Sequence, residues 1–167
     1  MRAAVAAAVT ATLVLGGCGG GDDDDAALPL LDEIGPAMAA VAGELGGTPQ
    51  YFEVNATPQV VNLFVASGGG TGVSQFVYVG DELAPIGQPR TAEGNTFTAA
   101  AVTFDPDTIL DGVTDELPDS DVVLFAIVGG PDGTVQYSAG VQSAAGGTLD
   151  VVLGPDGSVQ SVDPGTP

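Results

Sequence analysis

Residues 149–159 read Leu-Asp-Val-Val-Leu-Gly-Pro-Asp-Gly-Ser-Val, which is a strand pattern interrupted by a four-residue turn. Proline presets the backbone angle of an early turn position, and glycine accepts the positive φ that tight turns require. The same Gly-Pro-Asp-Gly tetrapeptide recurs at residues 130–133, again between runs of β-branched residues. Consecutive strands that are joined by tight hairpins predict an antiparallel sheet.

Upstream of these hairpins, the sequence predicts a helix. Asp105 is a preferred N-cap residue, Pro106 suits the first helical position, and Pro118 stops the helix. Its apolar face is formed by Ile109, Leu110, Val113 and Leu117. The strands expected after it are residues 121–128, 134–143, 148–153 and 158–162.

The first half of the chain shows a similar order. A helix begins near Leu30 and ends at Gly46-Gly47, with Gly35-Pro36 kinking it or marking its start. Its apolar residues follow helical spacing: Leu31, Ile34, Met38, Val41 and Leu45. The expected strands of this half are residues 51–55, 59–67 and 73–79, with a hairpin loop at 68–72 and a longer loop at 81–94. A further strand is expected at residues 96–104, where the second half begins.

The two halves align with each other. Val41, Glu44 and Leu45 recur 72 positions later as Val113, Glu116 and Leu117, and strands follow each helix in the same order. We therefore predict an α+β fold made of two α-β-β-β repeats, residues 28–95 and 96–167. Together the repeats form one antiparallel sheet with both helices packed on one face.

Composition excludes several classes of function. The 167 residues include 22 Asp and Glu but only two basic residues, Arg2 and Arg90, which gives a formal net charge of −20. A chain of this charge repels polyanions, so no nucleic acid is expected as a partner. The sequence has no His, which excludes Ser-His-Asp and Cys-His catalysis. Aromatic residues make up 5% and include no Trp, so a sugar platform is not expected. We predict no enzymatic activity and no cofactor.

The N-terminus has the pattern of a bacterial lipoprotein signal. Arg2 is followed by an apolar run that is too short to span a membrane. The run ends in Leu15, Gly16, Gly17 and Cys18, which resembles the lipobox that signal peptidase II recognises. The resemblance implies cleavage of residues 1–17, acylation of Cys18, and anchoring to the outer side of the cell membrane. An ordinary secretory signal with a chance Cys is the alternative.

Residues 18–27 would then form the lipidated Cys and a flexible acidic tether, since three Gly precede four consecutive Asp. Calcium binding by the four Asp is the alternative, but adjacent carboxylates on a flexible chain lack a preformed loop.

The order of elements and the hairpin at 149–159 resemble the tandem PepSY-like and β-lactamase-inhibitor-like folds of secreted bacterial proteins. The Ala, Gly, Val and Asp bias without Lys is similar to that of small actinobacterial lipoproteins. The resemblance implies binding or inhibition of another protein outside the cytoplasm. It assigns no contact residue to a position of this chain.

Three further sets of residues are candidates for a site. Asp107, Asp111 and Asp115 share one helical face and could bind a divalent cation, or they form a solvated face. Tyr78 and Tyr137 are candidate interface anchors, because tyrosine is frequent at binding hot spots. Arg90 either pairs with carboxylates or contacts a partner.

These features together predict a lipid-anchored, non-catalytic binding module outside the cytoplasm, with an envelope protein as a possible partner. A carrier of a lipid or small apolar ligand, and a cation-binding surface protein, are the alternatives.

Overall fold

The computed structural model describes residues 27–165. The expected signal segment, with Leu15, Gly16, Gly17 and Cys18, and the four consecutive Asp lie outside the described residues. The described chain contains eight strands: β1 (Tyr51–Ala56), β2 (Val61–Ser67), β3 (Gly72–Val79), β4 (Glu82–Thr91), β5 (Ser120–Gly129), β6 (Val135–Ser143), β7 (Thr148–Leu153) and β8 (Val159–Pro164). It also contains two α-helices, α1 (Ile34–Leu45) and α2 (Pro106–Glu116), and three short 3₁₀ turns, η1 (Leu31–Glu33), η2 (Ala99–Ala101) and η3 (Pro131–Gly133).

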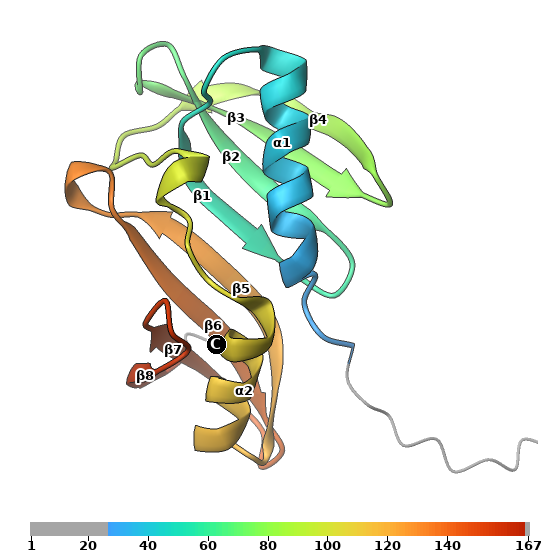
Figure 1. Ribbon diagram of the computed structural model, residues 1–167, viewed down its shortest axis with the longest axis vertical. Helices are drawn as coiled ribbons and strands as arrows, with labels where there is room; N and C mark the ends of the chain where they lie inside the picture. Colours follow the sequence, from blue (N-terminus) through green and yellow to red (C-terminus); the bar gives the residue numbers. More distant parts are fainter. Residues whose placement is uncertain (1–26, 166–167) are drawn as a thin grey trace, which may run out of the picture.

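All eight strands form one antiparallel sheet in the order β4-β3-β2-β1-β5-β6-β7-β8 (Figure 1). The first strand of each half lies at the centre, where residues 53–56 of β1 pair with residues 125–128 of β5. The two helices lie on the same face of the sheet (Figure 1), so the predicted α+β arrangement is confirmed. A repeat at the level of sequence stays a prediction.

Each half has four strands, whereas the predicted α-β-β-β repeat had three. The four strands of the second half lie where strands were expected, and the additional strand is in the first half. The segment 81–94 was expected to be a loop, yet most of it is the edge strand β4. Pro85 and Pro89 interrupt its apolar pattern, and an edge strand tolerates proline because one side of its backbone has no partner. Residues 96–104 were expected to be a strand, and this was wrong. Phe97 forms only an isolated bridge to Tyr51, and η2 follows.

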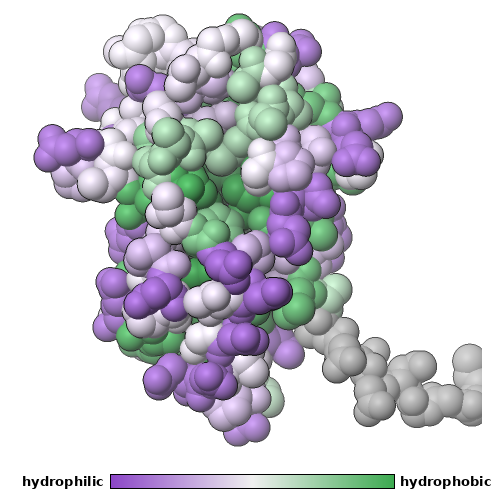
Figure 2. All heavy atoms as spheres, viewed as in Figure 1, coloured by the Kyte–Doolittle hydropathy of each residue, from purple (hydrophilic) through white to green (hydrophobic). Residues whose placement is uncertain are grey.

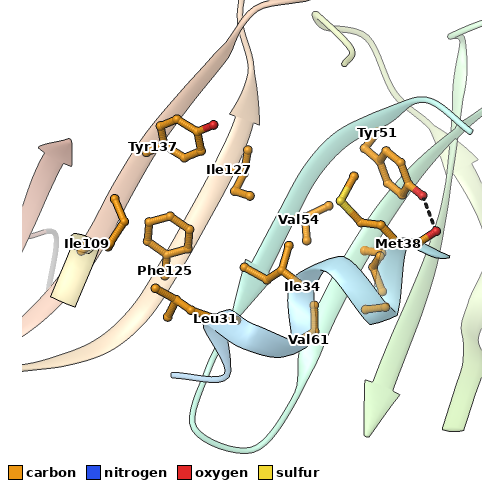
Figure 3. Packing of buried hydrophobic residues seen from close by; sticks show 14 of the residues in the cluster. Leu31, Ile34, Met38, Tyr51, Val54, Val61, Ile109, Phe125, Ile127 and Tyr137 are labelled. Atoms are coloured by element: carbon orange, nitrogen blue, oxygen red, sulfur yellow. Dashed lines mark hydrogen bonds between the residues drawn. The ribbon is translucent and has the colours of Figure 1, made fainter. Parts of the chain in front are cut away.

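The core lies between the sheet and the two helices (Figure 3). Four of the five predicted apolar residues of α1 are buried there, namely Leu31, Ile34, Met38 and Val41. Leu45 is 52% exposed because the helix ends at this residue, and the Gly46 N–H bonds back to the carbonyl of Ala42. The predicted stop at Gly46-Gly47 is therefore confirmed.

Helix α2 begins as predicted. The Asp105 carboxylate accepts hydrogen bonds from the backbone N–H and the hydroxyl of Thr108, both at 2.9 Å, and Pro106 occupies the first turn. The helix then packs directly on the turn between β7 and β8. A Cβ added at Gly112 would overlap the carbonyl group of Gly157, which itself has a positive φ of 78°. Two glycines thus allow backbone-to-backbone contact between helix and hairpin.

Candidate functional site

An apolar groove runs along α1 on the helical face of the sheet. We call it the α1 groove, and its volume is about 400 Å³. One wall is η1 and α1, and the other is the connector, residues 92–105, together with the start of α2. The lining residues are Leu31, Asp32, Ile34, Gly35, Met38, Ala39, Ala42, Ala99, Val102, Phe104 and Pro106. Figure 2 shows hydrophobic surface gathered in the middle of this face.

The sequence of α1 explains why a groove forms beside it. Ile34 and Met38 fill the core, while Gly35, Ala39 and Ala42 follow at spacings of four and three along the flank of the helix. These small residues leave space where longer side chains would bridge to the connector. A Cβ added at Gly35 would meet no atom within 4 Å. Asp32, Gly35 and Ala39 are exposed, so the groove is open along its side.

Tyr51 of β1 holds both walls of the groove. Its hydroxyl donates a hydrogen bond of 3.2 Å to the Met38 carbonyl oxygen of α1 (Figure 3). Its backbone exchanges two hydrogen bonds with Phe97 of the connector, at 2.8 and 2.9 Å, and the two rings lie 5.8 Å apart between centroids. Tyr51 is fully buried, and this burial raises its pKa to about 12. The sequence identified Tyr51 only as a strand residue.

Further contacts fix residues 103 and 104 of the connector. The Tyr137 hydroxyl accepts a hydrogen bond from the Thr103 N–H at 2.9 Å and donates one to the Thr103 carbonyl oxygen at 3.2 Å. Phe104 packs against Phe125 and Tyr137, with ring centroids 5.1 and 5.7 Å away. Because both walls are bonded to the same sheet, the groove is preformed.

The charges near the groove are carboxylates at one end. Asp32 of η1 is among the lining residues, and Pro106 is flanked in sequence by Asp105 and Asp107. All three carboxylates belong to exposed residues. The hydrogen bonds from Thr108 lower the pKa of Asp105, so this carboxylate stays ionised into acidic solution. The other end, at Ala42 and Ala99, has no charged residue in its lining.

The structure does not bring the proposed metal ligands together as a cation site. Asp107, Asp111 and Asp115 are exposed along α2. Asp115 instead lines a shallow pocket of about 260 Å³ that it shares with Glu116 and Asp156. Among residues 27–165, no group of three or more His, Cys, Asp or Glu side chains is arranged to hold a metal ion.

The two tyrosines proposed as interface anchors lie in the core. Tyr137 is 3% exposed and bonds to the connector, and Tyr78 is 6% exposed and donates a 3.2 Å hydrogen bond to Asp81. Burial, with the Asp81 carboxylate second, raises the pKa of Tyr78. Both hydroxyls are used within the chain, so neither residue offers a free surface. Arg90 is exposed on β4 and lines a second pocket of about 260 Å³ with Gln75 and Ile86.

Comparisons with known proteins show the fold but no family. The sequence matches no protein-family model and no curated protein. The fold is similar to that of a crystal structure from Clostridium difficile 630 named a "putative lipoprotein", with a TM-score of 0.58. The similarity covers 84% of this chain and 95% of that chain, at 9% sequence identity. Neither helix in the described part of this chain is long and apolar enough to cross a bilayer.

Proposed function

We propose that this protein is a lipid-anchored, non-catalytic binding module on the outer side of the cell membrane, and that the α1 groove is its binding site. The observation that supports the proposal most directly is the groove itself. Its volume of about 400 Å³ lies in the usual range of ligand sites, roughly 300–1,000 Å³, and its lining is apolar except for Asp32. Such a lining binds by removing apolar surface from water.

The anchor rests on the sequence Leu15-Gly16-Gly17-Cys18 and is supported by the fold shared with a protein whose name includes the word lipoprotein. Cys18 is the only Cys of the chain, so it cannot form an intramolecular disulfide, and two or more acyl chains suffice for stable anchoring. We expect Cys18→Ser to abolish incorporation of radiolabelled fatty acid and to release the protein from membranes. Undiminished labelling would contradict the anchor.

The binding site is tested with an uncharged dye whose fluorescence increases in apolar surroundings. The full chain carrying Cys18→Ser serves as the parent, because it removes the acyl chains from the measurement. Gly35→Leu and Ala39→Leu place isobutyl groups in the groove, and each should weaken dye binding about tenfold, equivalent to about 1.4 kcal/mol.

Gly43→Leu is the matched control. It introduces the same side chain on the same helix, but Gly43 is exposed, has no atom within 4 Å of an added Cβ, and does not line the groove. The control should bind dye as the parent does. If Gly35→Leu and Gly43→Leu bind dye equally well, the groove is not the binding site.

A carrier of a lipid or small apolar ligand is the second candidate. The apolar lining favours it, but a carrier shields its ligand from water, and drug-sized ligands are commonly 70–90% buried in their sites. Here Asp32, Gly35 and Ala39 leave the side of the groove exposed. An open groove of this kind suits a protein partner, because the rest of the partner shields the bound apolar side chains from water.

A further inference from the structure

We infer that the ligand of the α1 groove is the apolar face of a basic amphipathic helix from a partner protein. This inference rests on the proposed function and names the chemistry of the partner. It is carried by the shape of the groove, by the small residues of α1, and by the distribution of charge around them.

The groove is long enough to hold a short helix. Its α1 wall extends from Leu31 to Ala42, and a helical rise of 1.5 Å per residue makes this about 16 Å long. A partner helix would cover that length with about three turns. Three apolar side chains spaced at i, i+4 and i+7 would then lie along the groove, which is the usual pattern for a helix bound in an apolar groove.

The small residues allow the close approach that helix packing requires. Interaxial distances between packed helices are about 8–10 Å and depend on the side chains at the contact. Gly35, Ala39 and Ala42 present almost no side chain toward the groove. The opposite wall cannot move away readily, because Tyr51 and Tyr137 bond the connector to the sheet. A partner must therefore fill the groove with large apolar side chains, because the small residues of α1 leave that space empty.

The negative charge around the groove favours a basic partner. Asp32 lines one end of the groove, and Asp105 and Asp107 flank Pro106 at the same end. With a formal net charge of −20, the whole chain attracts cations and repels anionic ligands. A helix with Lys or Arg beside its apolar face would place positive charge near these carboxylates. An acidic helix would meet repulsion from the same groups.

The test uses two fluorescently labelled model helices with the same Leu positions, one with Lys and the other with Glu on the polar face. Binding to the full chain carrying Cys18→Ser is followed by fluorescence anisotropy at low and high salt. We expect the Lys helix to bind at least about tenfold more tightly than the Glu helix at low salt. This ratio should fall as salt screens the charges.

Variants separate the contribution of the apolar groove to helix binding from the contribution of the charge at its end. Gly35→Leu should abolish the binding of the Lys helix, whereas Gly43→Leu should not change it. Asp32→Asn should weaken the binding of the Lys helix about two- to fivefold at low salt and should not weaken the binding of the Glu helix, because it removes one exposed negative charge at the end of the groove.

Three results would overturn the inference: equal binding of the Lys and Glu helices, unchanged helix binding in Gly35→Leu, or tighter binding of monomeric lysophosphatidylcholine than of the Lys helix. The dye separates this failure from failure of the proposed function. If Gly35→Leu still blocks the dye, the groove remains a binding site and only the partner is wrong. If it blocks neither probe, both proposals fail.

Discussion

At the scale of single residues, Tyr51 connects more of the candidate site than any groove-lining side chain does. It bonds α1 through the Met38 carbonyl and the connector through Phe97, although its own ring is buried in the core and does not line the groove. A buried hydroxyl needs a hydrogen-bond partner, and this need fixes the position of α1 over the sheet. The walls of the groove are thus positioned by a buried residue of the sheet that does not itself line the groove.

Tyr51→Phe should lower the free energy of unfolding by about 1 kcal/mol at neutral pH, because it removes one buried hydrogen bond. It should also change the pH dependence. The folded state raises the pKa of Tyr51 from 10.0 to about 12, so the stability from the protonated hydroxyl is complete below pH 10 and is lost as the pH rises toward 12. The stability difference between the two proteins should shrink over this interval.

Absorbance titration of tyrosinate checks the assignment. The chain has three Tyr and no Trp, so the signal lost in the Tyr51→Phe variant is that of Tyr51. Tyr51→Phe should remove a component that ionises near pH 12. If it removes one that ionises near pH 10, Tyr51 is not buried as described.

Asp105 gives a prediction at the opposite end of the pH scale. Its pKa is lowered by the Thr108 hydrogen bonds, so its contribution to stability is present above its ordinary pKa of 3.8 and is lost as the pH falls through the lowered value. Asp105→Ala should lower the melting temperature at pH 7, and Asp105→Asn should lower it less, because Asn also caps helices. Thermal melts between pH 2 and 7 should show less pH dependence for Asp105→Asn than for the wild type. Equal melting temperatures for all three proteins at pH 7 would exclude the cap.

At the scale of elements, two helical glycines should respond oppositely to the same substitution. Gly43→Ala on α1 should raise the free energy of unfolding by about 0.5–1 kcal/mol, since Ala favours a helix and an added Cβ meets nothing within 4 Å. Gly112→Ala on α2 should destabilise the protein, because its Cβ would overlap the backbone of Gly157 and force the helix from the hairpin. Urea unfolding measures both changes. A stabilising Gly112→Ala would show that α2 does not touch the β7–β8 turn.

The elements that the sequence predicted correctly are those with a strong local signal. The cap at Asp105, the stop at Gly46 and the two Gly-Pro-Asp-Gly hairpins all depend on neighbouring residues. Strand β4 gave no such signal, because it is exposed at the edge of the sheet and contains two prolines. The sequence of residues 96–104 gave a false signal for a strand. The segment is rich in apolar residues because side chains such as Phe97 and Phe104 pack onto the sheet, although the segment does not extend the sheet.

The site was harder to predict than the fold for the same reason. The groove is formed between α1 and the connector, and their proximity follows from tertiary contacts of Tyr51 and Tyr137 that no local pattern encodes. A partial signal did exist. Gly35, Ala39 and Ala42 form a line of small residues beside the apolar stripe of α1, where a surface helix usually carries charged residues.

At the scale of the whole molecule, the charge of −20 predicts a dependence on salt. Repulsion between carboxylates destabilises the compact state, and salt shortens its range to about 10 Å at 0.1 M. The melting temperature should therefore rise with added NaCl. At matched ionic strength, CaCl₂ should raise it no further, because Asp107, Asp111 and Asp115 are not arranged as a metal site. A larger rise with calcium would restore the cation-binding alternative.

The outermost strands have a consequence if the protein is anchored to a membrane as proposed, because anchoring would concentrate it on a surface. An open sheet ends in two rows of unpaired backbone groups, onto which a neighbouring chain can add a strand. Here one outer strand carries Pro85 and Pro89, and the other is only six residues long and ends at Pro164. Each proline lacks the N–H that an incoming strand would need. Molecules crowded side by side in two dimensions would therefore resist fusing their sheets into a growing fibre.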